Sequence, residues 1–312
     1  MHWNAYLVLF RLLSPLHIGW RKVGNLQQTR PYLPGRNLRG ALAARLTRDF
    51  GEKQDYQETE EKIDKFLRFT YFYPAALTDI QKFYSELVAG TDFKKTDWLW
   101  PWKDPEKFSW LFLDSYASTA ISDKRTAEEG ALHETEFISH RTKEDKQVGL
   151  VGYAFARNDC NLPWKEVLNR LQFGGERTYG WGRVALWGRE PEKLKAEESK
   201  IKCFGYTVYP GRSKDDTFGG GPVFSLEKEE FLLAHTKAEV VECQGAIEPV
   251  AGRATKDGAF FGRKISMAGI CWVPGSKVKQ AAKFCLVKEG LWERTTREPN
   301  PANSDFPSGN KV

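Results

Sequence analysis

The stretch Phe173-Gly-Gly-Glu-Arg-Thr-Tyr-Gly-Trp-Gly-Arg-Val184 carries the strongest signal in this sequence. Four glycines fall within nine residues, and glycine permits both positive φ angles and the close approach of another backbone. Successive amide N–H groups in such a loop can form a concave anion site, and arginine adds a planar charged fork that suits phosphate. We therefore predict a phosphate-binding loop, in which the aromatic side chains either stack on bases or anchor the loop, made of Gly174, Gly175, Arg177, Thr178, Tyr179, Gly180, Trp181, Gly182 and Arg183.

The loop does not match the common nucleotide-binding motifs. It lacks the GK[ST] ending of a Walker loop, and it precedes a strand, whereas a dinucleotide-binding loop opens a helix. A plain glycine-rich turn between a helix and an edge strand is the alternative on composition alone. Phosphate binding without nucleotide hydrolysis fits the stretch best.

Two other segments rich in glycine and basic residues can converge on this loop. His17-Ile-Gly-Trp-Arg-Lys22 leaves a first strand, and Pro34-Gly-Arg-Asn-Leu-Arg-Gly40 lies at the start of a helix. We expect Asn37 to cap that helix, which begins near Leu38. Ordinary surface charge is the alternative for the two arginines of the helix start. A helix N-terminus attracts anions, so we add Arg36, Asn37 and Arg39 to the predicted phosphate contacts. From the segment after the first strand we add Arg21 and Lys22.

The order of predicted elements is that of a ferredoxin-like βαββαβ unit with an elaborated middle. Hydrophobic periodicity and breaker residues predict a strand at 3–13, a helix at 38–51, an acidic helix at 56–68, an irregular tryptophan-rich insertion at 91–116, a polar hairpin at 117–148, a strand at 149–156, a helix at 163–173 and a strand at 184–187. The four-stranded sheet of such a unit is a platform that RNA-recognition modules use.

We predict an α+β fold with tandem ferredoxin-like, RRM-like βαββαβ domains that carry insertions, the second being more β-rich. The first domain, with the glycine-rich loop and the inserted hairpin, is placed at residues 1–190, and the second at residues 191–294. Residues 295–312 hold three prolines and little apolar content, which predicts a disordered tail.

Composition indicates a folded protein of the cytosol. Hydrophobic residues make up 41% of the chain, and the formal charge of +6 is a weak sign of a polyanionic partner. The five cysteines form no CxxC pair and are odd in number, which predicts neither a zinc ribbon nor a disulfide framework. No run approaches the roughly 20 apolar residues of a membrane helix. We expect no membrane association, no metal ion and no cofactor.

Three segments resemble the signature motifs of the repeat-associated mysterious proteins, the RAMP superfamily of CRISPR–Cas systems. They are Leu13–Gly19, Leu33–Leu42 and the glycine-rich stretch quoted above. In the second half, Gly245–Arg253 and Gly262–Ser276 are similar to the Csx-ten family of type III-D effectors. By motif position, the resemblance implies that RNA is contacted by Arg36, Arg39, Gly174, Gly175, Arg177, Thr178, Tyr179, Gly180 and Arg183.

The resemblance also implies a role and a set of partners. That family is a Cas-five-like subunit with tandem ferredoxin-like folds, which binds the 5′ handle of crRNA. The implied partners are crRNA, the large polymerase-like subunit, Cas-seven-like backbone subunits and, indirectly, target RNA. In the second half, the basic residues of the segments that resemble the type III-D family flank two phenylalanines. Such a pattern suits single-stranded RNA. We therefore expect RNA contacts from Arg253, Arg263 and Lys264, with a charged strand and two core phenylalanines as the alternative.

We expect the protein not to be an enzyme. Metal-independent RNA cleavage needs a positioned general base, and His17, after the first strand, is the one attractive histidine. A structural His17 is favoured, and the resemblance is not to the processing branch. The Cas-seven-like branch cleaves target RNA with a loop aspartate, but residues 20–30 contain no Asp or Glu. The alternatives left open are a crRNA-processing endoribonuclease using His17, a Cas-seven-like backbone subunit and a protein-only scaffold.

Overall fold

The centre of the fold is a pair of antiparallel strands buried on both faces. The computed structural model describes residues 2–50, 55–89, 98–188, 190–195, 200–211, 220–256 and 260–295. Strand β1 (Trp3–Leu12) pairs with β8 (Val148–Arg157) from Trp3↔Arg157 to Arg11↔Gly149. Both strands are nearly continuous apolar runs, as expected where a sheet is covered on each side.

The first unit has the strand order of a ferredoxin-like fold. Strand β9 pairs with β1, β1 with β8, and β8 with both β4 and β5, every pair being antiparallel. Its elements in chain order are β1, β2 (Gly19–Val23), β3 (Leu26–Thr29), α1 (Gly35–Phe50), α2 (Tyr56–Phe66), β4 (Leu67–Phe69), β5 (Tyr73–Ala76), α3 (Leu77–Ala89), α4 (Pro105–Phe112), β6 (Leu113–Ser118), β7 (His133–Ile138), β8, β9 (Val184–Leu186) and β10 (Glu192–Lys193). The predicted α+β class and the ferredoxin-like unit are confirmed.

Two predicted helix positions are wrong. Helix α1 begins at Gly35, so Asn37 lies in its first turn and does not cap it; the Asn37 N–H donates to the Pro34 carbonyl at 3.0 Å. The predicted helix at 163–173 is reduced to a 3-10 turn at Leu168–Arg170. From Leu171 the backbone is extended, because Gln172 must pair with Arg183 to close the glycine-rich loop.

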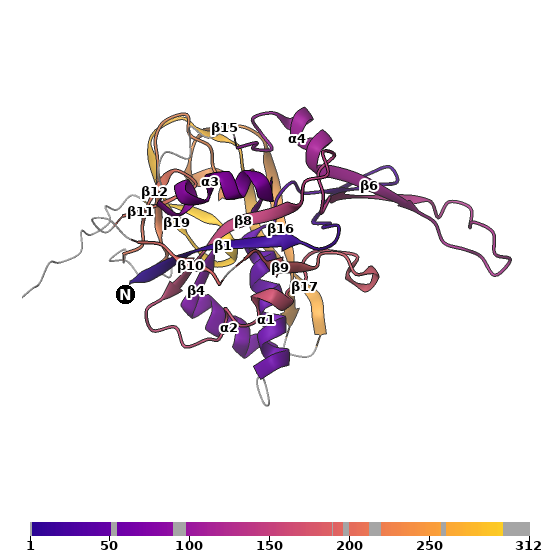
Figure 1. Cartoon of the computed structure of the whole chain (residues 1–312), viewed down its shortest axis with the longest axis horizontal. Coiled ribbons are helices and arrows are strands. Elements are labelled where there is room, and N and C mark those ends of the chain that lie inside the picture. The colour runs from indigo at the N-terminus through magenta and orange to yellow at the C-terminus, as the bar shows by residue number, and fades with distance from the viewer. Residues whose placement is uncertain are drawn as a thin grey trace, which may run out of the picture.

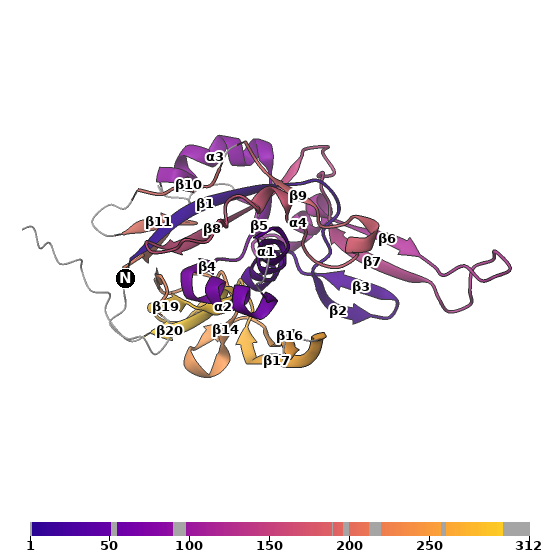
Figure 2. The same ribbon diagram turned by 90° about the horizontal axis from the view of Figure 1, so that it is seen from below.

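Alternate residues of the central strands enter two separate cores. Leu7 and Leu9 of β1 face a core that α3 and strands of the second half complete, whereas Val8 and Phe10 face α1 and α2. This is the period-two alternation of a strand, with apolar residues at both phases. Figures 1 and 2 show α3 and α1 on opposite sides of the β1–β8 pair.

The second half is β-rich, as predicted. Its eight-stranded sheet has the order β11-β12-β13-β19-β20-β14-β17-β16, and β15 pairs with β18. Within the described part of residues 200–295 the helical segments are 3-10 turns at Ala238–Val240 and Lys288–Gly290. The strands are β11 (Ile201–Cys203), β12 (Tyr206–Tyr209), β13 (Val223–Leu226), β14 (Thr236–Lys237), β15 (Cys243–Gln244), β16 (Ile247–Lys256), β17 (Phe260–Trp272), β18 (Lys277–Val278), β19 (Ala282–Leu286) and β20 (Trp292–Thr295).

The second half covers the sheet face that an RNA-recognition module leaves open. Tyr71, Tyr73 and Tyr153 on that face are at most 2% exposed. The Tyr73 hydroxyl donates to the Leu233 carbonyl at 2.6 Å, and Tyr153 packs edge-to-face on Phe204. The expectation that this sheet presents an RNA platform is therefore wrong.

Most of the tryptophan-rich insertion also packs inward, although Trp110 is 59% exposed, and the predicted irregular structure is wrong over Pro105–Phe112, which forms helix α4. Trp98 and Trp100 are 4% and 6% exposed and belong to the same core as Tyr73. The Trp100 and Trp102 rings stack at 5.0 Å. These three rings contribute apolar packing, which leaves them unavailable as a surface for bases.

A separate four-stranded sheet, in the order β2-β3-β7-β6, extends from the body. The segment Trp20–Val23 forms most of strand β2, because it pairs with β3. The predicted polar hairpin is present, with its strands at Leu113–Ser118 and His133–Ile138. It projects to the right in Figures 1 and 2.

The predicted boundary between residues 190 and 191 stays a prediction. Strand β10 lies beyond it but pairs with β1 of the first unit. Residues 296–312 of the predicted tail lie outside the described residues. Among the described residues, no helix is long and apolar enough to cross a membrane.

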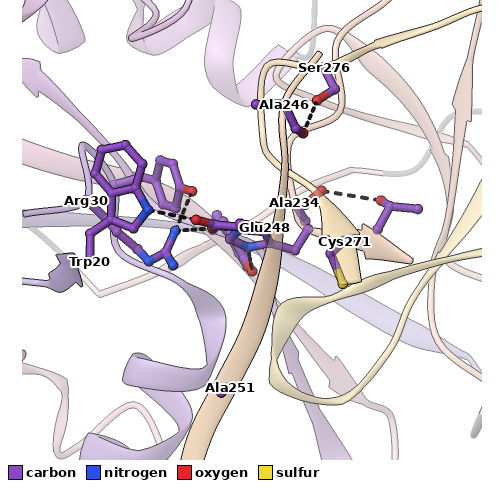
Figure 3. A network of polar contacts seen from close by, with 12 residues as sticks. Trp20, Arg30, Ala234, Ala246, Glu248, Ala251, Cys271 and Ser276 are labelled. Carbon is purple, nitrogen blue, oxygen red and sulfur yellow. Dashed lines mark hydrogen bonds and ion pairs between the residues drawn. The ribbon is translucent and has the colours of Figure 1, made fainter. Parts of the chain in front are cut away.

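A partly buried carboxylate joins β16 of the second half to β2 and to Arg30, which follows β3, in the first unit (Figure 3). Glu248 Oε1 accepts from Arg30 Nη1 and from His235 Nε2, each at 2.5 Å. Glu248 Oε2 accepts from the Trp20 indole N–H at 2.7 Å. The Arg30 and Glu248 side chains are 8% and 14% exposed. One carboxylate therefore satisfies three donors from three segments of the chain.

The network fixes the protonation of its members. Burial raises the pKa of Glu248, but the three hydrogen bonds outweigh it and lower the pKa to about 2. Burial lowers the pKa of His235, whose hydrogen bond with Glu248 opposes the shift. A neutral His235 donates from Nε2 to Glu248 and accepts at Nδ1 from the Tyr71 hydroxyl at 2.7 Å. Both ring nitrogens of His235 and both carboxylate oxygens of Glu248 then have a partner of the right kind, whereas Arg30 Nε is buried without a partner among the described residues.

We predict that Glu248→Gln lowers the free energy of unfolding at neutral pH by about 3–5 kcal/mol, because the buried Arg30 loses its counter-charge. The pKa of Glu248 is lower in the folded state than its ordinary 4.5, so its stabilisation is complete above about pH 4.5 and is lost as the pH falls toward 2. Denaturant unfolding at a series of pH values should show a gap between wild type and variant that narrows over this window.

The control is Glu293→Gln, which removes a surface ion pair with Lys237 at 3.8 Å. It should change stability by less than about 0.5 kcal/mol. A gap for Glu248→Gln that stays constant down to pH 2 would contradict the assigned role of the carboxylate.

Candidate nucleic-acid interface

The glycine-rich loop is tied to the segment that follows β1. Its two ends meet through a hydrogen bond from the Phe173 N–H to the Gly182 carbonyl at 2.8 Å. The Gly182 N–H donates to the Pro15 carbonyl at 2.7 Å, and the Gly175 N–H donates to the His17 carbonyl at 2.9 Å. Phe173 is buried in the core beneath α1. The predicted convergence of this loop with the His17 segment is present.

Two of the glycines are required by the close approach of other backbone atoms. Gly174 has φ +77°, and a Cβ there would lie 2.1 Å from the His17 carbonyl oxygen. Gly182 has φ +76°, and a Cβ there would lie 1.8 Å from the Phe173 carbonyl oxygen. Gly180 also has a positive φ, +83°, but open space surrounds its Cβ position. The first two positions are restricted by space as well as by conformation.

The glycine amides serve the loop itself. The Gly180 N–H donates to the Arg177 carbonyl at 3.0 Å, in addition to the bonds of Gly175 and Gly182 described above. Because these three N–H groups already have intramolecular partners, they do not contribute to the predicted anion site. The glycines shape the loop, and its side chains are left to contact a ligand.

The exposed tip of the loop is cationic. Arg177, Thr178 and Tyr179 are exposed, Tyr179 by 80%, in a 3-10 turn that follows a left-handed Glu176. Arg183 at the base of the loop is exposed as well. Within the described part of the chain, neither Arg177 nor Arg183 makes an ion pair. Both guanidinium groups can therefore bind phosphate without breaking an existing pair.

The two aromatic residues of the loop have different roles. Trp181 is partly buried and packs edge-to-face on Phe137 of β7, with ring centroids 5.0 Å apart. The Gln172 amide donates to the Trp181 carbonyl at 2.7 Å and braces the loop from inside. Trp181 therefore anchors the loop, whereas Tyr179 faces solvent.

The two arginines of the helix start are engaged by protein. Arg39 donates to both carboxylate oxygens of Asp64 at 2.5 and 2.8 Å and to Glu60 at 2.8 Å, which joins α1 to α2. Burial lowers the pKa of Arg39, but these acidic partners raise it overall. Arg36 Nη1 donates to the Ala251 carbonyl of β16 at 2.7 Å. Phosphate binding by Arg39 would have to compete with two carboxylates.

Helix α1 and the loop lie on the same side of the molecule. Burial and Glu60 raise the pKa of Tyr56 in α2, while Arg39 and Arg177 lower it, so the charge of Arg177 reaches this hydroxyl. A Cβ on Gly40 of α1 would lie 3.8 Å from the same hydroxyl. The loop tip is thus close to the α1–α2 pair.

The basic residues of β2 are exposed. Arg21 Nε donates to Gln28 Oε1 at 2.7 Å, and its guanidinium lies 4.2 Å from the centre of the Trp20 ring. Lys22 is exposed on the same strand. Trp20, which is 40% exposed, was not among the predicted contacts, although a lone aromatic between Gly19 and two basic residues was the available signal.

The second basic signature is only partly described. Arg253 lies in β16, and Arg263 and Lys264 lie in β17, which pairs with it. The side chains of these three residues lie outside what the structure describes. Their predicted RNA contacts stay predictions.

His17 is a buried brace at the junction of the loop and β7. It is 6% exposed, and its Nδ1 lies 2.6 Å from the Glu136 carbonyl oxygen. A carbonyl only accepts, so Nδ1 carries the proton and Nε2 is the acceptor in the neutral ring. Within the described residues, no group of three or more His, Cys, Asp or Glu side chains is placed to hold a metal ion.

Comparison with known families and structures adds one strong match. Residues 9–185 match the family model described as the RAMP superfamily. The chain is similar to a chain of the cryo-EM structure of the Type III-B Cmr-beta bound to cognate target RNA and AMPPnP, state 1, with 16% identity, a TM-score of 0.44 and coverage of 88% of this chain and 86% of that chain. For Cmr-beta bound to cognate target RNA alone the identity is 14% and the TM-score 0.44, with coverage of 88% and 86%. For the apo state of Cmr-beta the identity is 12% and the TM-score is 0.37, and the match covers 60% of this chain and 96% of that chain. A comparison with curated proteins found no match.

We predict that Gly182→Ala lowers the free energy of unfolding by at least about 3 kcal/mol, because a methyl group there meets the Phe173 carbonyl and the φ is unfavourable. Gly180→Ala is the matched control: it has the same φ penalty without the collision and should lose only about 1–2 kcal/mol. Denaturant midpoints of the two variants measure the difference. Equal losses would show that the loop does not need the close contact at Gly182.

Proposed function

Because this chain belongs to the RAMP superfamily of CRISPR–Cas proteins, we propose that it binds crRNA as a non-catalytic subunit of a type III effector complex. The observation that supports this most is the exposed tip of the glycine-rich loop. Arg177 and Arg183 are held there by a rigid backbone, and no carboxylate of the described residues neutralises them. Charge-assisted bonds from such groups suit the phosphates of an RNA strand.

The contrast between arginines within the chain supports the choice of contacts. Arg30 and Arg39 are paired with Glu248 and with Asp64 and Glu60, and both pairs are largely buried. A phosphate would have to displace those carboxylates. At Arg177 and Arg183 it would displace only water, so the proposed RNA contacts centre on the loop.

The finer assignment rests on the sequence resemblance. We propose a Cas-five-like, Csx-ten-type subunit of a type III-D complex that holds the 5′ handle of crRNA. It would contact the large polymerase-like subunit and Cas-seven-like backbone subunits, and meet target RNA only indirectly. All five cysteines are free thiols, which suits a protein acting in the reducing cytoplasm.

The proposal is non-catalytic because of how His17 is held. A general base must reach the proton that it removes, and the His17 ring is almost fully buried. Its Nδ1 is bonded to the Glu136 carbonyl, and a Cβ on Gly175 would lie 3.1 Å from its Cδ2. The acceptor Nε2 is the one feature that favours the alternative, a crRNA-processing ribonuclease.

We predict that RNA affinity falls with salt, with a log–log slope of about −0.7 per phosphate contact. Replacing Arg177 and Arg183 together with Gln should make the slope shallower by about one to two units, because two charge contacts are removed. Titrations of labelled single-stranded RNA at several salt concentrations measure the slope. Arg141→Gln with Lys143→Gln is the matched control, since both residues are paired with acids at the hairpin base. An unchanged slope in the loop variant would exclude the loop as the phosphate contact.

We predict that His17→Asn leaves the length of bound RNA unchanged. An asparagine amide can donate to the Glu136 carbonyl in place of Nδ1–H, yet it cannot act as a base. Incubation of precursor RNA with wild type and variant, read on a sequencing gel, checks this. Cleavage by the wild type that disappears in His17→Asn would establish the ribonuclease alternative.

A further inference from the structure

Strand β2 presents an exposed ring and a guanidinium group in contact with each other, which the loop assignment leaves unused. We propose that Trp20 and Arg21 form a stacking platform for one unpaired nucleobase of single-stranded RNA. The proposal rests on the RNA-binding function proposed above and adds a base contact to its phosphate contacts. The sequence motifs assign no role to the Trp20 side chain.

The Trp20 ring is held in place by a hydrogen bond to Glu248. Its indole N–H donates to Glu248 Oε2 at 2.7 Å, and the other oxygen of that carboxylate is fixed by Arg30 and His235. Figure 3 shows the Trp20 ring at the edge of this network, with its nitrogen toward Glu248. The ring is nevertheless 40% exposed. An exposed indole anchored to a buried ionic network is preorganised, so a base that stacks on it orders little further.

Arg21 lies over the Trp20 ring, where it offers a second planar group and adds charge. Its guanidinium lies 4.2 Å from the centre of the Trp20 ring, and the Nε bond to Gln28 at 2.7 Å holds it there. Bases stack on arginine planes as well as on aromatic rings. The terminal nitrogens of Arg21 can also reach a phosphate of the same nucleotide.

The position of the platform matches an RNA strand that leaves the glycine-rich loop. The His17 carbonyl accepts the Gly175 N–H, and Trp20 follows three residues later. The Cα atoms of His17 and Trp20 are therefore at most about 11 Å apart, even if the chain between them is fully extended. A strand held at the loop can reach the platform within a few nucleotides.

The charges around the ring favour RNA over an apolar protein surface. All five residues of β2 are exposed, and two of them, Arg21 and Lys22, are cationic. The carboxylate below the ring is neutralised by Arg30. A ligand that offers both a π-face and negative charge is single-stranded nucleic acid.

The test compares Trp20→Phe with Trp20→Leu in the full chain. Both variants lose the hydrogen bond to Glu248, and only Trp20→Phe keeps an aromatic face. Melting temperatures of the two variants check that they are equally stable. The probe is a labelled oligouridine of about 16 nucleotides, a length at the upper end of common site sizes. We expect Trp20→Leu to bind about tenfold more weakly than Trp20→Phe, as stacking on one base predicts, with the same salt slope.

A second arm uses the same oligonucleotide with abasic sites, which keeps every phosphate. There the difference between the two variants should disappear. Equal affinities of the two variants for intact RNA, or a difference that persists on abasic RNA, would overturn the platform while leaving the proposed function standing. Loss of association with another protein subunit, without loss of RNA affinity, would identify the ring as a protein contact instead. Absence of salt-dependent RNA binding by the wild type would sink both proposals.

Discussion

The burial of β1 on both faces is the constraint from which the interface follows. Leu7 and Leu9 are covered from one side, and Val8 and Phe10 from the other, so the strand has no freedom to shift or rotate. The chain therefore leaves β1 at a defined point. The carbonyl oxygens of Pro15 and His17, just beyond that point, hold the glycine-rich loop. The same segment continues into β2, so the loop and the Trp20 ring take their places from one strand.

Electrostatics divides the arginines into two groups. Arg30 and Arg39 are paired with carboxylates that cannot be removed without leaving a charge that is largely buried. Those on the loop, Arg177 and Arg183, are exposed and make no ion pair among the described residues. The first group contributes to a unique arrangement of the two halves, and the second is available to a polyanion. Net charge alone, which is only +6, would not have separated them.

Local sequence patterns predicted the elements that depend on local forces. The apolar runs of β1 and β8, the amphipathic α2 and the glycine-rich loop were all visible as periodicity or composition. The predictions that were wrong concern features that depend on contacts with residues distant in the sequence. Helix α1 starts at Gly35, where a Cβ would lie 2.7 Å from the Phe69 carbonyl oxygen and 2.8 Å from the Gly290 Cα, so a larger residue does not fit. Nothing near Gly35 in the chain signals these contacts.

The candidate interface was predictable in its location and less so in its chemistry. Glycine density identified the loop, but only the structure shows that the amides of Gly175, Gly180 and Gly182 are bonded within the chain. Arg39 looked equivalent to Arg177 in the sequence, since its acidic partners Asp64 and Glu60 come from the next helix. Trp20 was overlooked because its anchor, Glu248, is far away in the sequence.

The position of Trp3 has a consequence for biosynthesis. Its backbone N–H donates to the Pro210 carbonyl at 3.0 Å and its indole N–H to the Gly220 carbonyl at 2.6 Å, while its strand pairs as far as Arg157. Trp3 is thus enclosed in part by a residue that lies 217 positions further along the chain. Until that residue has been translated, an apolar strand lacks its native cover, so slow folding and transient exposure of apolar surface are expected.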